Sequence, residues 1–192
     1  MNDQSHRGEP PPSISAWRAA HLIERLARAL RAGDYSAGLN PAQWEALRYL
    51  SRANRFSRTP AALASYLGAS RGTVSQTLIA LESKGLIRKT RSRSDGRSVD
   101  IEVAEKGRRV LAEDGERDLA RDIAACADAA ALTADLERVL SQALARRGGK
   151  TFGVCRTCKF FRRDGAARRC ALLNEPLTAL EAEAICAEME AA

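Results

Sequence analysis

Aromatic residues are scarce in this chain of 192 residues, since Phe, Trp and Tyr together make up 5% of it. Alanine is abundant instead, and this balance favours helices over sheets because strands prefer aromatic and β-branched side chains. Hydrophobic residues make up 45% of the chain and charged residues 29%. We therefore expect a mainly α-helical globular protein with a packed core.

Long apolar segments are also missing. No run approaches the roughly 20 residues that a membrane-spanning helix needs. The N-terminal segment MNDQSHRGEPPPS is polar and rich in proline. It lacks the apolar core of a signal peptide, and we expect residues 1–14 to be disordered. These features predict a cytoplasmic protein without a membrane partner, in a compartment where thiols stay reduced.

Histidine is nearly absent, with only His6 and His21. The sequence has neither a phosphate-binding loop nor an H-E-x-x-H motif, so we expect no enzyme activity. Acidic residues number 24 against 31 Lys and Arg, which gives a formal net charge of +7. A basic chain of this size is suited to a polyanionic partner, and the distribution of the basic residues indicates which one.

Capping residues mark the beginnings of helices in the first half of the chain. After an apolar stripe over residues 15–33, Asn40 and Thr59 each stand directly before a proline. This is the order of an N-cap and a first helical residue. Ser70 is expected to cap a third helix after only a tight turn.

A β-hairpin is predicted next, because residues 86–92 and 98–104 alternate and are joined by RSDGR. Two longer helices are expected over residues 105–128 and 133–146. Cys126 lies in the first of these, and we interpret it as a core residue rather than a metal ligand.

Two helices joined by a tight turn and followed by a basic hairpin form a winged helix-turn-helix. The second helix carries short polar groups near its N-terminus, where a recognition helix meets base edges. The basic hairpin alone could be a solvated loop. Because a helix pair precedes it, we favour the interpretation that it contacts the minor groove or the phosphates of DNA. The predicted DNA-binding residues are Ser70, Arg71, Thr73, Ser75, Gln76, Thr77, Arg91, Arg93 and Arg97.

Residues 15–146 resemble the MarR family of dimeric winged-helix regulators. The resemblance is carried by LNPAQWEALRYL and by ASRGTVSQTLIALESKGLIRKTRSRSDGRSVDIEVAEKG. It implies double-stranded DNA with a palindromic operator as partner, and repression as the default. It adds Asp95 as the residue that orients Arg97 in the minor groove. Ala104 stands where the family often has a capping threonine, so we expect a slightly frayed helix start.

Apolar stripes on residues 15–30 and 132–144 exceed what one small winged helix can cover. The two stripes could pack on each other within one chain. A homodimer is favoured because two recognition helices would bind a palindromic site. The predicted interface residues are Trp17, Leu22, Leu26, Leu136 and Leu140.

Cysteine is concentrated at the end of the chain, after an expected linker over residues 147–152. Residues 153–192, which we call the cysteine module, contain four of the five cysteines in the spacing C-x2-C-x11-C-x15-C. This pattern predicts a four-thiolate metal site, since a unit of ~40 residues usually needs a staple. The predicted metal ligands are Cys155, Cys158, Cys170 and Cys186.

Zinc is the usual metal of four thiolates, but zinc ribbons bring two C-x2-4-C knuckles. The segments CRTCKF, CALLNEPL and IC resemble small high-potential iron–sulfur proteins and the cluster-bearing small subunits of benzylsuccinate synthase. This resemblance implies a [4Fe-4S] cluster that Phe160 and Leu172 shield, with a turn at Pro176-Leu177. The aromatic that often follows the last cysteine is missing, which admits solvent. A zinc site or a metal-free redox thiol set remains the alternative.

Together the two parts predict a DNA-binding regulator that senses redox state, oxygen or iron through the cluster, which would act on the neighbouring dimer helices. A second hypothesis is a MarR-like regulator of a small aromatic ligand, with a structural zinc site. In it, Trp17, His21 and Trp44 could line a pocket or pack in the core. A third is an iron–sulfur accessory or electron-transfer subunit, against which the polar helix and the Arg-rich hairpin argue.

Overall fold

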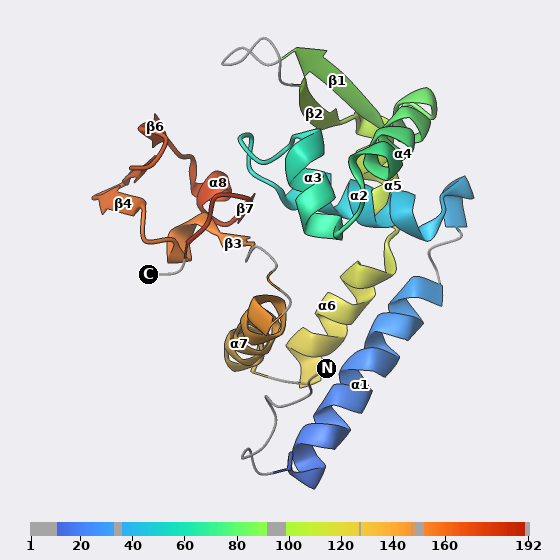
Figure 1. The fold of residues 1–192 in the computed structure, drawn as a ribbon, viewed down its shortest axis with the longest axis vertical. Coiled ribbons are helices and arrows are strands. Elements are labelled where there is room, and N and C mark those ends of the chain that lie inside the picture. Colours follow the sequence, from blue (N-terminus) through green and yellow to red (C-terminus); the bar gives the residue numbers. More distant parts are fainter. Residues whose placement is uncertain are drawn as a thin grey trace, which may run out of the picture.

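The computed structural model describes residues 11–32, 36–91, 99–126, 128–146, 148 and 152–190. Figure 1 shows a winged helix above, a helical lobe below and the cysteine module at one side. The helices are α1 (Ile14–Ala32), α2 (Pro41–Arg52), α3 (Pro60–Leu67), α4 (Arg71–Ser83), α5 (Glu105–Ala112), α6 (Gly115–Cys126), α7 (Ala129–Arg146) and α8 (Ala179–Ala182). The strands are β1 (Ile87–Arg91), β2 (Val99–Val103), β3 (Gly153–Val154), β4 (Phe161–Asp164), β5 (Ala167–Cys170), β6 (Glu175–Pro176) and β7 (Ile185–Cys186).

The expected N-caps of the winged helix are confirmed. The Asn40 side chain accepts a hydrogen bond from the Gln43 amide and the Gln43 side chain accepts one from the Asn40 amide, which completes a capping box at α2. Thr59 accepts from the Ala62 amide and so caps α3, and Ser70 accepts from the Thr73 amide and so caps α4. Ala104 precedes α5 without a side-chain cap bond, as its methyl group requires.

The core of the winged helix lies between α2, α3, α4 and the base of the β1–β2 hairpin. Leu47, Leu63, Leu81 and Ile101 are fully buried there. The strands pair antiparallel, with Ile87 opposite Val103. The Ile101 amide donates to the carbonyl of Arg58 across 2.9 Å. This bond ties the base of the wing to the segment that leads into α3.

The helical lobe, formed by α1, α6 and α7, contains no residue that is buried within the described part of the chain. The helix expected over 105–128 is in fact two, because Asp114 interrupts it. The Asp114 carboxylate binds Arg48 of α2 at 2.6 and 2.7 Å and also accepts from the Glu116 amide at the start of α6. The next helix begins at Ala129 rather than at 133, since Asp128 accepts from the first free amides.

The cysteine module consists of short antiparallel strands and one helical turn. Strand β3 pairs with β7, and β4, β5 and β6 form a second small sheet. Few of its described side chains are buried: Cys155, Leu177 and Cys186 form a cluster, and Ala182 of α8 is also buried. This agrees with the expectation that the unit cannot build a sufficient core of its own.

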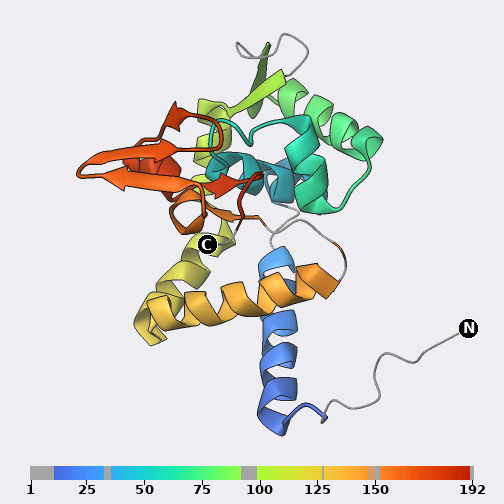
Figure 2. The same cartoon turned by 60° about the vertical axis from the view of Figure 1, so that its left-hand side comes forward.

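The cysteine module packs against the winged helix, and Figures 1 and 2 both place the two side by side. Ile185 pairs with Ala53 in a parallel bridge and packs on the main core. Phe152, expected at the end of a linker, lies at ring-centroid distances of 6.3 Å from Tyr49 and 5.1 Å from Tyr66. The chain therefore enters the module through a contact with α2 and α3. Within the described ranges no helix is long and apolar enough to cross a membrane.

Candidate nucleic-acid interface and four-cysteine site

Helix α4 presents the polar face that the sequence predicted. Val74, Leu78 and Leu81 are buried against the core, while Ser70, Arg71, Thr73, Ser75 and Gln76 are exposed and Thr77 is half-buried. The preceding Gly68 adopts a left-handed conformation with a φ of 61° at the end of α3. This residue type is suited to the tight turn between the two helices. Burial of the apolar face thus directs the polar face outward.

The polar side chains of α4 divide into two groups. Ser70 and Thr73 hydrogen-bond each other, and the Thr77 hydroxyl donates to the Thr73 carbonyl. Arg71, Ser75 and Gln76 make no side-chain hydrogen bond or ion pair with any residue in the described ranges. These three side chains are free to bind base edges or phosphates.

The wing is described only at its base. Arg91 is exposed at the end of β1, and Arg88 is also exposed on this strand, whereas Lys89 forms an ion pair with Glu82 at 2.9 Å. The predicted contacts Arg93, Asp95 and Arg97 lie outside the described residues.

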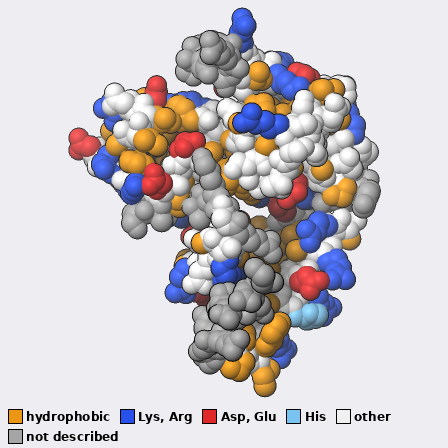
Figure 3. Space-filling model, in the orientation of Figure 1, with side chains coloured by type: hydrophobic (Ala, Val, Ile, Leu, Met, Phe, Trp, Pro, Cys, Tyr) orange, Lys and Arg blue, Asp and Glu red, His pale blue; other side chains and the backbone are white. Residues whose placement is uncertain are grey.

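The helical lobe exposes the predicted interface residues. Large apolar side chains of α1 and α7 lie on its surface, where exposure to water is unfavourable. Figure 3 shows apolar side chains at the lower end of the molecule. Their exposed fractions are 66% for Trp17, 46% for Leu22, 49% for Leu26, 40% for Leu136 and 56% for Leu140. The described residues of one chain therefore leave the two stripes exposed.

Trp17, His21 and Trp44 lie in different surroundings. Trp44 is a core residue, with 3% of its surface exposed. Trp17 and His21 are exposed on α1, so neither packs in the core with Trp44. Cys126, expected in the core, is exposed at the end of α6, because this helix has no buried face in the single chain.

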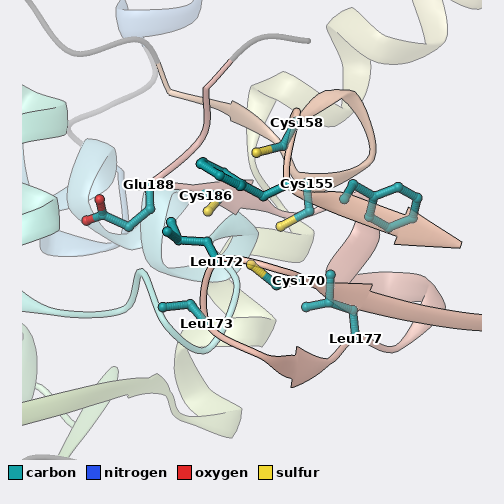
Figure 4. A pocket seen from close by; sticks show the side chains of 10 residues that line it. Cys155, Cys158, Cys170, Leu172, Leu173, Leu177, Cys186 and Glu188 are labelled. Atoms are coloured by element: carbon teal, nitrogen blue, oxygen red, sulfur yellow. The ribbon is translucent and has the colours of Figure 1, made fainter.

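The fold brings Cys155, Cys158, Cys170 and Cys186 to one pocket, although 31 positions separate the first from the last. Cys155 and Cys158 flank a short turn after β3, while Cys170 ends β5 and Cys186 ends β7. Figure 4 shows the four sulfur atoms around a shared space. The rest of the lining is mainly apolar and consists of Phe160, Phe161, Leu172, Leu173, Leu177 and Glu188. Glu188 lies near the position, just after the last cysteine, where the resembling iron–sulfur proteins often have an aromatic residue.

The winged helix supplies polar contacts to one of these thiols and to the chain directly after another. The Asn54 side-chain amide donates to Cys155 Sγ at 3.2 Å. The Ser57 hydroxyl accepts from the amide of Ala187, the residue after Cys186, at 2.8 Å. Both Asn54 and Ser57 are 1% exposed. The four-cysteine site is thus built from both parts of the chain.

The two buried thiols differ in acidity. The Cys155 thiol donates a hydrogen bond to Cys186, and this lowers the pKa of Cys186 to about 6 against the effect of burial. Bonds from the Glu188 amide, Asn54 and Ser57 act in the same direction. The pKa of Cys155 is raised, first because it gives that hydrogen bond and second because it is buried.

Within the described residues, no group of three or more His, Cys, Asp or Glu side chains is arranged to hold a single metal ion. The cysteines share a pocket without converging on one point. Asn54 and Ser57 were not identified from the sequence as residues of this site. Only their burial against segments far along the chain reveals their role.

Comparisons with known proteins agree with the winged helix. Residues 37–98 match the model of the MarR family. No curated protein matches the sequence.

The solved structures similar to this chain include three regulators. The transcriptional regulator BldR from Sulfolobus solfataricus is 24% identical with a TM-score of 0.51, over 67% of this chain and 94% of that one. A MarR transcriptional regulator from Methanosarcina mazei is 18% identical with a TM-score of 0.53, over 70% and 99%. MepR from S. aureus, in a complex with DNA, is 18% identical with a TM-score of 0.50, over 68% and 99%. The chain has the MarR-like winged-helix fold.

Proposed function

We propose that this chain is a DNA-binding transcriptional regulator that acts as a homodimer, and that its four-cysteine site carries an iron–sulfur cluster through which it senses redox state, oxygen or iron. The observation that carries the proposal is the free polar face of α4 on a MarR-like fold. The second part rests on the cysteine pocket, which lies against the same winged helix.

DNA binding follows from the geometry of α4. Arg71, Ser75 and Gln76 project from the first half of the helix with no internal partner in the described ranges. Arg can pair with guanine and Gln with adenine in the major groove. The positive end of the α4 dipole adds attraction for phosphate. The similarity to MepR, which is seen bound to DNA, supports the same partner here.

The homodimer would cover the apolar faces of the helical lobe. About half or more of the side-chain surface is exposed in the single chain at Trp17 and Leu26 on α1 and at Leu140 on α7. Removing apolar surface of this kind from water stabilises a dimer by about 25 cal/mol for each square ångström. Two copies of α4 would then read two half-sites of a palindromic operator.

We favour an iron–sulfur cluster over one zinc ion for these four cysteines. A tetrahedral zinc site needs four sulfurs ~2.3 Å from one atom, and so ~3.8 Å apart. A [4Fe-4S] cluster takes one thiolate at each of four iron atoms, so its ligands surround a space instead of a point. Cys155, Cys158, Cys170 and Cys186 would hold it, and Phe160, Leu172 and Leu177 would exclude water. When bound, the cluster would supply a centre that is labile to oxidation.

Purification without oxygen tests the proposal. We expect a brown protein with about four iron and four sulfide ions per chain, which is the content of one [4Fe-4S] cluster. It should select specific duplexes from a random-sequence DNA library. A colourless protein with one zinc per chain would support the structural-zinc alternative, and failure to select any duplex would reject the regulator itself.

A further inference from the structure

We infer that Asn54 and Ser57 are positioning residues of the four-cysteine site and that the turn in which they lie couples this site to the DNA-binding elements. The turn is formed by residues 53–58, between α2 and α3, and we call it the docking turn. The inference deepens the proposed function, because it names how the state of the thiols reaches α3 and the wing.

Asn54 faces both parts of the chain at once. Its Oδ1 accepts from the Ser57 amide at 2.9 Å, which holds the docking turn in shape. Its Nδ2 donates to Cys155 Sγ at 3.2 Å, and its backbone amide donates to the Ile185 carbonyl at 2.9 Å. One buried side chain therefore fixes the conformation of the turn and the position of a predicted ligand.

Ser57 makes a corresponding contact beside the other buried thiol. Its hydroxyl accepts from the amide of Ala187, the residue after Cys186, at 2.8 Å. Its carbonyl accepts from the Tyr49 hydroxyl at 2.8 Å, inside the winged helix. Hydrogen bonds to ligating sulfurs orient them and tune a cluster's reduction potential. Asn54 and Ser57 are thus placed to respond to any change at Cys155 or Cys186.

The far side of the docking turn belongs to the DNA-binding elements. The Arg58 carbonyl accepts from Ile101 of β2 at 2.9 Å, and the Arg58 side chain donates to the Ala53 carbonyl at 2.8 Å. Thr59, the next residue, caps α3. A shift of the turn would therefore move the first helix of the helix-turn-helix and the base of the wing together.

Salt bridges hold the turn to the module at its exposed edge. Arg55 pairs with Glu181, lies 3.5 Å from Glu175 and donates to the Pro176 carbonyl at 2.8 Å. Its guanidinium also lies 4.3 Å from the centroid of the Phe56 ring. These contacts keep the cysteine module attached to the docking turn when the state of the thiols changes. A change at the thiols therefore moves the turn and does not simply detach the module.

Loss of the thiol contacts would destabilise this arrangement. A buried amide N–H without an acceptor is costly, so Asn54 must find a new partner when Cys155 moves away. That requires the docking turn to rearrange. A coupling of this kind typically changes affinity at the second site by about 5-fold to 150-fold.

The first test needs no metal and uses the full chain with Cys155→Ala and Cys158→Ala. The former removes the acceptor of Asn54. The latter is the matched control, because no hydrogen bond joins the Cys158 side chain to the docking turn within the described residues. Hydrogen exchange of metal-free protein should speed up at α3 and β2 amides by about tenfold in Cys155→Ala alone. Equal exchange in the two variants would overturn the inference.

The second test uses Asn54→Asp and Ser57→Ala, with Ser83→Ala as control. Asn54→Asp keeps the oxygen that accepts from the Ser57 amide but loses the donor to Cys155; Ser57→Ala is the safer variant if the buried carboxylate prevents folding. Both should retain metal and DNA binding, with a shifted cluster potential, while the ratio of DNA affinities between loaded and metal-free protein falls towards one. An undiminished ratio would contradict the inference. Absence of metal or of DNA binding in the unmodified chain would instead reject the proposed function and leave the exchange test decisive.

Discussion

The side-chain amide of Asn54 donates a hydrogen bond to the sulfur of Cys155, a residue 101 positions further along the chain. This contact joins the segment before the first helix of the helix-turn-helix to the four-cysteine pocket. It also gives the proposed signal a route other than the one expected from the sequence. The sequence suggested that the cysteine module acts on the dimer helices, whereas these contacts reach α3 and the base of the wing directly.

Removal of the Phe152 ring should loosen the cysteine module from the winged helix. The ring lies edge-on to Tyr49 and Tyr66, and Phe152→Ala should cost about 2 kcal/mol, since the ring is only half-buried. Urea unfolding followed by circular dichroism measures the loss. Leu180→Ala, at a side chain that is 85% exposed, is the control. An equal and small effect for both would show that the Phe152 contact does not hold the module.

The ion pair between Arg48 and Asp114 should contribute more than any surface pair. The two side chains are 12% and 5% exposed and lie 2.6 Å apart. Asp114→Ala removes the nearer carboxylate from a buried cation and leaves Glu116 at 3.8 Å, so it should cost about 3 kcal/mol.

Asp135→Ala is the matched control for Asp114→Ala. It removes an exposed i,i+3 pair with Arg138 on α7, which should cost no more than about 0.5 kcal/mol. Thermal and urea unfolding of both variants measure the difference. Similar losses would show that Asp114 does not brace the break between α5 and α6.

Recognition by α4 should depend on its N-terminal half. Arg71→Ala and Gln76→Ala remove exposed groups that have no internal partner in the described ranges, so folding should be unaffected. Each should weaken binding to a selected duplex by about 1–3 kcal/mol. Ser83→Ala, at the other end of the same helix, should bind as the unmodified chain does. Fluorescence anisotropy measures this, and unchanged affinity in all three would exclude α4 as the recognition helix.

Dimer formation should fail when charge enters the helical lobe. Leu140→Glu places a carboxylate in the expected interface, where it would be buried without a partner. Native mass spectrometry should give a dimer for the unmodified chain and a monomer for this variant. Leu180→Glu, which adds the same charge on the cysteine module, should remain dimeric. A monomeric unmodified chain at micromolar concentration would refute the dimer.

The winged helix was predictable because it depends on contacts between residues close in sequence. Features that depend on packing between distant segments were not. Asn40, Thr59 and Ser70 cap helices through atoms only three residues away, so their pattern is visible in sequence. The break at Asp114 was missed because it depends on Arg48, 66 positions earlier. Asn54 was missed for the same reason, since nothing near it indicates that a thiol will contact it. The pocket could be anticipated from cysteine spacing, but its dependence on the docking turn could not.

The most direct test of the account is the affinity of anaerobically purified protein for a selected duplex, measured before and after removal of its metal. We predict iron and sulfide in the loaded protein and a change in affinity of about tenfold or more on their loss. Helicity of the winged helix should be unchanged. Equal affinities in the two states would contradict the claim that the four-cysteine site controls DNA binding.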